Sequence, residues 1–188
     1  MRSSYYIRFN PAAKIDYLHL LAFYDLAEYR KETKAFDTIR YSSITDLAKR
    51  LNLSSSTVSR ILKNTEYKDF IEVDKENKVI RLLCSFPKGE KNAFVNLSAE
   101  EVKLLKDKKD NLLSHYLIYL KYYCGYTKEK KTDFTAIQFL SACGYSIKSK
   151  QNFDRVSSYN KLLTEKGLIK IEKYRDELGH TRNRYSFL

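Results

Sequence analysis

The chain has 188 residues, of which 43% are hydrophobic and 31% are charged, with only five glycines and two prolines. This composition excludes collagen-like, low-complexity and disordered proteins, and the length allows one large domain or two small ones. Lysine and arginine number 35 against 23 aspartates and glutamates, which gives a net charge of +12. This charge favours a polyanionic partner, with nucleic acid ahead of an anionic membrane surface.

The sequence has the pattern of neither a membrane span nor a signal peptide. No run approaches the roughly 18 apolar residues that a spanning helix needs, and residues 1–6 lack the apolar stretch of a signal peptide. We therefore expect a cytoplasmic protein without a membrane partner. Cys84, Cys124 and Cys143 lie far apart, without a C-x-x-C pair and in apolar or aromatic surroundings, which indicates reduced thiols in the core.

A long helix is the first predicted element of the chain. Asn10 followed by Pro11 is typical of a helix start, and we expect this helix to run to about Lys31. Apolar residues cover nearly all of its sides between residues 18 and 26. This pattern indicates a helix that is buried on two sides.

Two shorter helices and a hairpin are predicted to follow. Ser43 is the expected cap of a helix that ends near Asn52, a residue that tolerates the left-handed conformation. Ser54 is the expected cap of the next helix, whose Val58 and Ile61 lie at helical spacing on its inner face. A β-hairpin is predicted from residues 70–73 and 78–82 around the turn 74–77.

The second half of the chain has a similar predicted order. A short strand over residues 93–97 precedes a small helix, which Ser98 and Glu101 begin with a capping box, and Thr135 caps another helix. The last helix is expected between about Asn152 and Lys166. Strands are predicted at 168–174 and 182–188, around the loop 175–181.

An internal repeat relates the two halves. Residues 16–24 align with 115–123, and residues 43–54 align with 135–146. Both halves are basic: residues 1–92 carry 17 positive and 12 negative groups, and residues 93–188 carry 18 and 11. Because residues 85–92 contain a proline and lie between strand-like segments, they are the predicted linker between domains at 1–84 and 93–188.

The spacing of small and apolar residues in the first half is typical of a helix-turn-helix. Two crossing helices would touch at Ile44, Leu47, Ala48, Leu51, Leu53, Val58 and Ile61. A related pattern in the second half has Gly144 where the first has Asn52, and a predicted hairpin follows each one. The expected fold class is therefore mainly α with small β-hairpins (α+β), in two tandem winged helix-turn-helix domains.

The outer faces of the third helices hold the candidate DNA-contacting side chains. Short hydroxyls approach phosphates and bases closely, and Arg, Asn and Gln contact base edges in the major groove. The candidates in the first half are Ser55, Ser56, Thr57, Ser59, Arg60 and Lys63. Those in the second half are Lys148, Lys150, Gln151, Asn152, Arg155, Ser158 and Lys161. The alternative is a solvated polar face without a partner, and Asn152 is open to interpretation as an N-cap only.

The hairpin turns are also basic. Cations in such turns suit contact with the DNA backbone or the minor groove. The candidates are Lys75, Asn77 and Lys78 in the first turn and Arg175, His180, Arg182 and Arg184 in the second. The alternative is that these loops are charged because they are solvated.

The sequence offers no pattern of an active site. His19, His115 and His180 are isolated from one another, and paired acidic clusters, Gly-rich phosphate loops and metal-ligand spacings are missing. Seven of the 16 tyrosines lie on the first predicted helix or on its counterpart at 115–123, at core spacing, which favours packing over a stacking platform for single strands. We therefore expect a protein that is not an enzyme and needs no metal or cofactor.

The whole sequence resembles the replication initiator proteins of plasmids and phages, which carry two winged helices. The second half is similar to domains of Gram-positive replisome-organiser and initiator proteins. The segments that carry this similarity are 94–97 (FVNL), 116–120 (YLIYL), 144–146 (GYS) and 166–169 (KGLI). The resemblance implies origin recognition, with replication proteins such as a helicase or primase as further partners.

The expected function is sequence-specific binding of double-stranded DNA. Origin recognition is the first biological role, and transcriptional regulation is the alternative. A winged-helix scaffold that binds protein and not DNA remains a third possibility, because the fold alone does not determine the partner. The chain is expected to act as a monomer, in which the two halves mimic a dimer, or as a homodimer.

Overall fold

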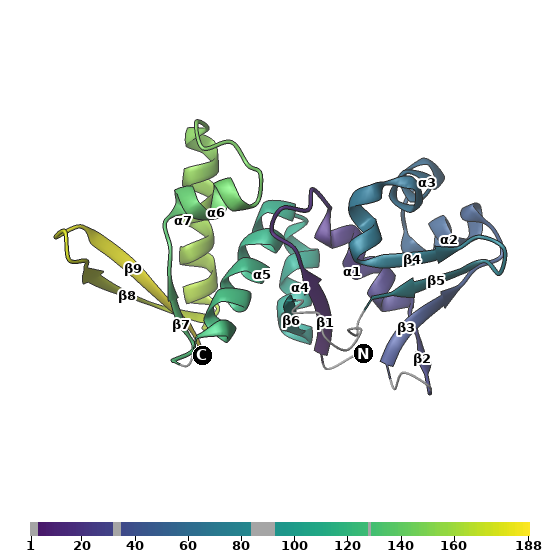
Figure 1. Ribbon diagram of the computed structural model, residues 1–188, viewed down its shortest axis with the longest axis horizontal. Coiled ribbons are helices and arrows are strands. Elements are labelled where there is room, and N and C mark those ends of the chain that lie inside the picture. The colour runs from purple at the N-terminus through teal and green to yellow at the C-terminus, as the bar shows by residue number, and fades with distance from the viewer. Residues whose placement is uncertain (1–3, 32–34, 84–92, 128) are drawn as a thin grey trace. The chain divides into compact units, whose positions relative to one another are not determined.

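The computed structural model describes residues 4–31, 35–83, 93–127 and 129–188 (Figure 1). These residues contain seven α-helices, one 3-10 helix and nine strands in three antiparallel sheets. They form two compact units: unit 1 is drawn from 4–8, 15–31, 35–83 and 97–109, and unit 2 from 9–14, 93–96, 110–127 and 129–188. Cys84 and the predicted linker at 85–92 lie outside the described residues.

The prediction of a mainly α chain made of two tandem winged helix-turn-helix domains is wrong. The fold is α+β, with about 47% helix and 26% strand, and its sheets are larger than the expected hairpins. One sheet has four strands in the order β2-β3-β5-β4, another has three in the order β7-β9-β8, and β1 (Ser4–Phe9) pairs with β6 (Ala93–Ser98). Two of the unforeseen strands, β2 (Glu28–Arg30) and β7 (Lys131–Asp133), are too short and polar to produce an alternating pattern.

The first helix of unit 1 is shorter than predicted. Helix α1 (Tyr17–Leu26) begins after Asp16, whose carboxylate accepts a hydrogen bond from the Leu18 amide at 2.9 Å. It ends where β2 begins, because the chain turns into extended backbone at Ala27. The side chains of Tyr17, Leu20, Leu21 and Phe23 are fully buried, which confirms the predicted burial on more than one side.

Unit 1 continues with β3 (Ala35–Arg40), the helix pair α2 (Ile44–Leu51) and α3 (Ser55–Lys63), the 3-10 helix η1 (Thr65–Asp69), and the hairpin β4 (Ile71–Asp74) and β5 (Val79–Leu82). Asn52 ends α2 with a φ of 55°, as its tolerance of the left-handed region predicts. The Leu53 amide then donates to the Ala48 carbonyl at 2.9 Å and closes the turn between α2 and α3. Helix α4 (Ala99–Lys108) begins with the predicted Ser98 and Glu101 capping box.

Unit 2 is built on α5 (Asn111–Tyr126), followed by β7, α6 (Ala136–Ala142), α7 (Lys150–Glu165), β8 (Ile169–Arg175) and β9 (Thr181–Phe187). Its core is aromatic: the ring centroids of Tyr116 and Phe139 lie 4.9 Å apart, and Phe134 stacks on Tyr185 at 4.9 Å. The prediction that the tyrosines of this helix pack in the core is confirmed for Tyr116 and Tyr119, which are at most 5% exposed.

The described cysteines are core residues. Cys124 and Cys143 are free thiols that are buried, and burial raises their pKa values to about 11 and about 12. Both thiols therefore stay protonated at neutral pH. Across the described ranges, none of the helices has the length and apolar character needed to cross a membrane.

Candidate nucleic-acid interface

Helix α3 presents an exposed polar face that contains no acidic residue. Ser54 caps it: its hydroxyl accepts from the Thr57 amide at 3.1 Å and bonds to the hydroxyls of Ser56 at 2.9 Å and Thr57 at 2.8 Å. Ser55 and Ser56 are exposed on the first turn, and Arg60 and Lys63 are exposed further along. The sequence of the helix, SSTVSRILK, gives this face only positive charge.

The turn between β4 and β5 places further cations near the end of α3. Lys75 and Lys78 are exposed, and Lys75 lines the same groove as Lys63. Asn77 has a different role, because its side-chain amide donates to the Asp74 carboxylate at 2.8 Å and its backbone amide donates at 3.0 Å. These bonds lower the pKa of Asp74 and hold the turn. Two predicted cations of the turn are thus available at the surface, while Asn77 stabilises the turn itself.

Exposed cations lie at the beginning of helix α7. Lys148, Lys150 and Gln151 are exposed, and the Ser149 side chain makes no capping hydrogen bond to the first turn of the helix. Asn152 instead donates to the Ser146 carbonyl at 2.9 Å and ties the helix to the preceding turn. Further along the exposed face, Ser158 donates to the Asp154 carbonyl and Lys161 lies 3.9 Å from Glu165.

Arg155 belongs to an intramolecular network. Its guanidinium donates to Asp110 at 2.5 Å and to the Tyr159 hydroxyl at 2.9 Å, while Tyr159 donates to the other Asp110 oxygen at 2.6 Å. Asp110 is also the N-cap of α5 and accepts from the amides of Leu112 and Leu113. Desolvation together with hydrogen bonding to Asp110 raises the pKa of Tyr159. This arrangement gives Arg155 a role in fixing α7 to α5.

The turn between β8 and β9 is organised by one aspartate. The Asp176 carboxylate accepts from the amides of Leu178 at 3.1 Å and His180 at 2.8 Å and from the Arg182 guanidinium at 2.8 Å. The hydrogen bond from the Arg182 guanidinium, together with the hydrogen bond from the His180 amide and the charge interaction with that side chain, lowers the pKa of Asp176. Gly179 adopts a φ of +80° in this turn. The side chain of Leu178 is left 80% exposed at the tip.

The basic residues around this tip differ in their availability. Arg175 is exposed, and the His180 ring lies 3.5 Å from Asp176. Arg184 lies over the Tyr174 ring, 4.4 Å from its centroid, and Tyr174 donates to Asp133. Of the predicted basic residues on this hairpin, His180, Arg182 and Arg184 therefore have contacts within the protein, and Arg175 is the exposed cation.

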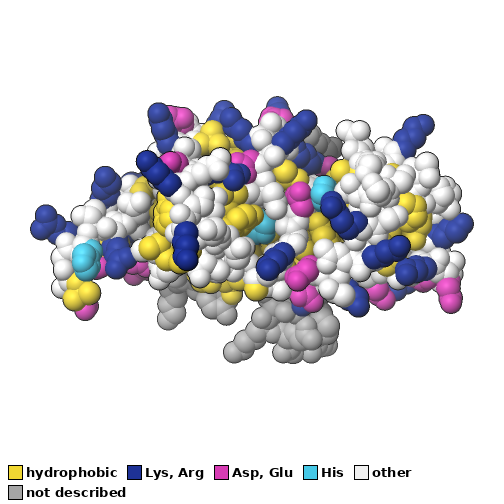
Figure 2. All heavy atoms as spheres, turned by 90° about the horizontal axis from the view of Figure 1, so that it is seen from above, with side chains coloured by type: hydrophobic (Ala, Val, Ile, Leu, Met, Phe, Trp, Pro, Cys, Tyr) yellow, Lys and Arg dark blue, Asp and Glu magenta, His cyan; other side chains and the backbone are white. Residues whose placement is uncertain are grey.

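Sequence reasoning missed one cation near the predicted residues of unit 1. Lys68 lies on η1 and lines the groove together with Lys63 and Lys75. No helical or alternating pattern marks it, because a single 3-10 turn is too short to produce a period. Figure 2 shows many Lys and Arg side chains spread over the visible face, with fewer Asp and Glu among them.

Comparison with known proteins adds no further assignment. No protein-family model, curated protein or solved structure matches this chain. Among the described residues, no group of three or more His, Cys, Asp or Glu side chains is arranged to hold a metal ion. The functional argument therefore depends on the charges and contacts of the two units.

Proposed function

We propose that the protein binds double-stranded DNA. The observation that carries the proposal is the acid-free face of α3, which lies next to the lysine-bearing turn between β4 and β5. Within the described part of the chain, Lys63, Lys75 and Lys78 form no ion pair. Cations that are not neutralised by the protein are available to displace counterions from phosphates, which is the main source of affinity for DNA.

The side chains of α3 suit contact with the major groove. A helix fits that groove, and Arg60 extends from its exposed face, where a guanidinium can bond to both acceptors of a guanine edge. Ser55 and Ser56 are short enough to let the helix backbone approach the phosphates. We therefore propose that α3 reads base edges and that Lys63, Lys75 and Lys78 bind the backbone.

Unit 2 supports the same function by another arrangement. Lys148 and Lys150 flank the start of α7, where backbone amides and the helix dipole favour a phosphate. Arg175 on the β8–β9 hairpin adds an exposed cation. We propose that this unit contributes mainly phosphate contacts, since Asn152 and Arg155 are engaged within the protein.

Arg60→Ala is the variant that tests the base-reading role of α3. It should weaken binding to a preferred duplex by about 10- to 100-fold and relax the preference at one position, because a bidentate contact is worth about 1–3 kcal/mol. Fluorescence anisotropy with duplexes that differ at single positions measures both effects. Lys103→Ala, at an exposed site on α4, is the matched control and should leave affinity nearly unchanged. Equal losses for Arg60→Ala and Lys103→Ala would contradict the proposal.

The biological role that we propose is recognition of a replication origin in the cytoplasm, with a helicase or primase as a later partner. Its support is the similarity of segments such as 94–97 and 116–120 to replication initiators. Footprinting on the DNA that surrounds the gene tests this role. Protection of repeated sites is expected, whereas protection of a single promoter site would favour transcriptional regulation instead.

A further inference from the structure

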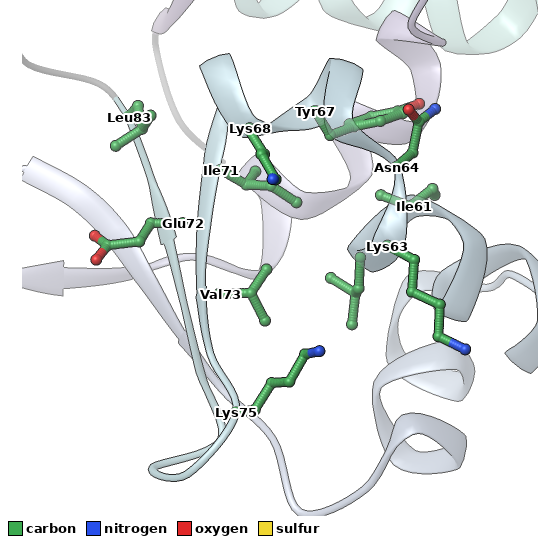
Figure 3. A pocket seen from close by; sticks show the side chains of 11 residues that line it. Ile61, Lys63, Asn64, Tyr67, Lys68, Ile71, Glu72, Val73, Lys75 and Leu83 are labelled. Carbon is green, nitrogen blue, oxygen red and sulfur yellow. The ribbon is translucent and has the colours of Figure 1, made fainter.

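A groove in unit 1 combines an apolar floor with lysines. It has a volume of about 610 Å³ and lies between the end of α3, η1 and the β4 strand (Figure 3). Leu62, Val73 and Leu83 line it and are only half-buried, so part of their apolar surface faces solvent. Ile61 and Ile71 complete the floor. Such a surface is stabilised when an apolar side chain covers it.

The charged residues of the groove are nearly all positive. Lys63, Lys68 and Lys75 line it, and in the described part of the protein they form no ion pair. Figure 3 shows Lys68 toward one end of the groove and Lys75 toward the other, with Val73 between them. Glu72 is the one acidic lining residue; its carboxylate points away from Val73 in Figure 3 and lies 3.6 Å from Arg81.

We propose that this groove binds a peptide segment of a partner protein in which apolar side chains are flanked by carboxylates. The apolar side chains would cover Leu62, Val73 and Leu83, and the flanking carboxylates would pair with Lys68 and Lys75 at the two ends. This charge complementarity supplies orientation, while burial of the floor supplies affinity. The proposal assigns the groove a protein partner in addition to the proposed DNA, and because Lys75 is also a proposed phosphate contact, the peptide and the duplex would compete for this lysine.

Duplex DNA fits the groove less well than such a peptide. A sugar–phosphate backbone satisfies the lysines but offers no apolar side chain that reaches the floor between them. A compact small molecule also suits it less, because small-molecule sites enclose most of their ligand, whereas the elements that border this groove enclose it only in part. An extended or helical segment covers an open groove and its charged rim together.

A direct test measures binding of a short fluorescein-labelled peptide, in which leucine and phenylalanine are flanked by aspartates, to the full chain by anisotropy. A second peptide, with serine in place of leucine and phenylalanine, measures how much of the affinity comes from the charged residues alone. The protein variants are Lys68→Glu and Val73→Asp, with Lys103→Glu as a control of equal charge change on α4 of unit 1. Because Lys68 is exposed on η1, its variant tests the groove even if Val73→Asp disturbs folding.

The expected result is binding of the first peptide that is about tenfold weaker in Lys68→Glu than in Lys103→Glu, a difference of about 1.4 kcal/mol. The serine peptide should bind at least about tenfold more weakly than the first. Equal affinity for both peptides, or an equal loss in Lys68→Glu and Lys103→Glu, would overturn the proposal. A duplex affinity that Lys68→Glu lowers as much as the peptide affinity would assign the groove to DNA. If the unaltered protein does not bind the duplex, the proposed DNA function fails, and the peptide measurements still decide the proposal for the groove.

Discussion

In each unit the hydroxyl of a later tyrosine bonds to the residue that caps a helix, α1 in unit 1 and α5 in unit 2, but through different contacts. In unit 1 the Tyr67 hydroxyl accepts from the Asp16 amide at 3.0 Å and donates to the Asp16 carbonyl at 3.3 Å. In unit 2 the Tyr159 hydroxyl donates to the Asp110 carboxylate, which also binds Arg155. The same architectural link is thus made with backbone in unit 1 and with an ion pair in unit 2.

This difference determines which cations are available for a ligand. In unit 1 the link is made by Tyr67 of η1 without a cation, and Arg60 and Lys63 of the preceding helix α3 are exposed. Helix α7 uses Arg155 for attachment; Lys148 and Lys150 are exposed near its beginning, and Lys161 is exposed further along but lies 3.9 Å from Glu165. A shared order of elements therefore does not imply that equivalent helix positions have equivalent functions.

Replacing the capping aspartates should produce the largest difference between the units. Asp110→Ala removes an N-cap and the charged partner of Arg155 and Tyr159, so we expect a loss of about 2–4 kcal/mol in the free energy of unfolding. Asp16→Ala removes the cap of α1 and a 3.6 Å contact with the His19 ring, and should cost about 1 kcal/mol. Denaturant unfolding followed by circular dichroism measures both values. Equal losses would show that the Arg155 network adds little to unit 2.

Paired lysine variants sharpen the comparison at the level of DNA affinity. Replacing Lys63 and Lys75 with alanine in unit 1, or Lys148 and Lys150 in unit 2, should each weaken duplex binding by about tenfold at moderate salt, because two phosphate contacts are removed. Arg155→Ala should instead act on the free energy of unfolding more than on affinity. Anisotropy and thermal unfolding of the same samples separate these effects. A loss in affinity confined to one pair would limit DNA binding to that unit.

The turns that follow α2 and α6 provide a smaller contrast. Gly144 has a φ of +70°, and an added Cβ would meet only the Lys14 side chain at an ordinary 3.7 Å. Gly144→Ala should therefore cost about 1 kcal/mol from backbone conformation alone. Asn52→Gly should change the free energy of unfolding by less than this, since Asn already tolerates a φ of 55°. A much larger cost for Gly144→Ala would mean that the turn lacks room for a methyl group.

Acid should loosen the two hairpin turns by small amounts. Hydrogen bonds lower the pKa values of Asp74 and Asp176 below the ordinary value of 3.8. Since a lowered pKa stabilises the folded turn above the ordinary value, this contribution is lost as the pH falls through the lowered pKa. Amide signals of Asn77 and His180 in an NMR titration should shift in that range. The shift at His180 should disappear in Asp176→Asn, and its persistence would assign the effect to another group.

Local signals in the sequence located the caps well. Ser43, Ser54, Ser98 and Thr135 all accept the hydrogen bonds expected of N-caps, since a cap depends only on neighbouring residues. The start of α1 at Tyr17 was missed because Asn10-Pro11 has the same pattern as a helix start, although Asn10 instead accepts from the Ala12 amide outside any helix. The short strand β7 was missed because it depends on pairing with the distant strand β9, whereas β2, which pairs with the neighbouring β3, is too short and polar to produce an alternating pattern.

The candidate interface was predictable only in part for a related reason. Exposed cations such as Lys63 and Lys150 follow from charge and helical position, which the sequence contains. The contacts that engage Arg155, Asn152 and Asn77 join them to residues whose position depends on the folded chain or on turn geometry. Helical spacing identifies an outward-facing residue but does not reveal a partner 45 residues away, as with Arg155 and Asp110.

The salt dependence of duplex binding tests the central claim most directly. If six to ten cations of the two units contact phosphates, the logarithm of the binding constant should fall against the logarithm of salt concentration with a slope of about −5 to −9. Removing Lys63 and Lys75 together should reduce the magnitude of that slope by about two. A slope near zero for the unaltered protein, or one that this pair does not change, would contradict the account of unit 1 as a DNA-binding surface.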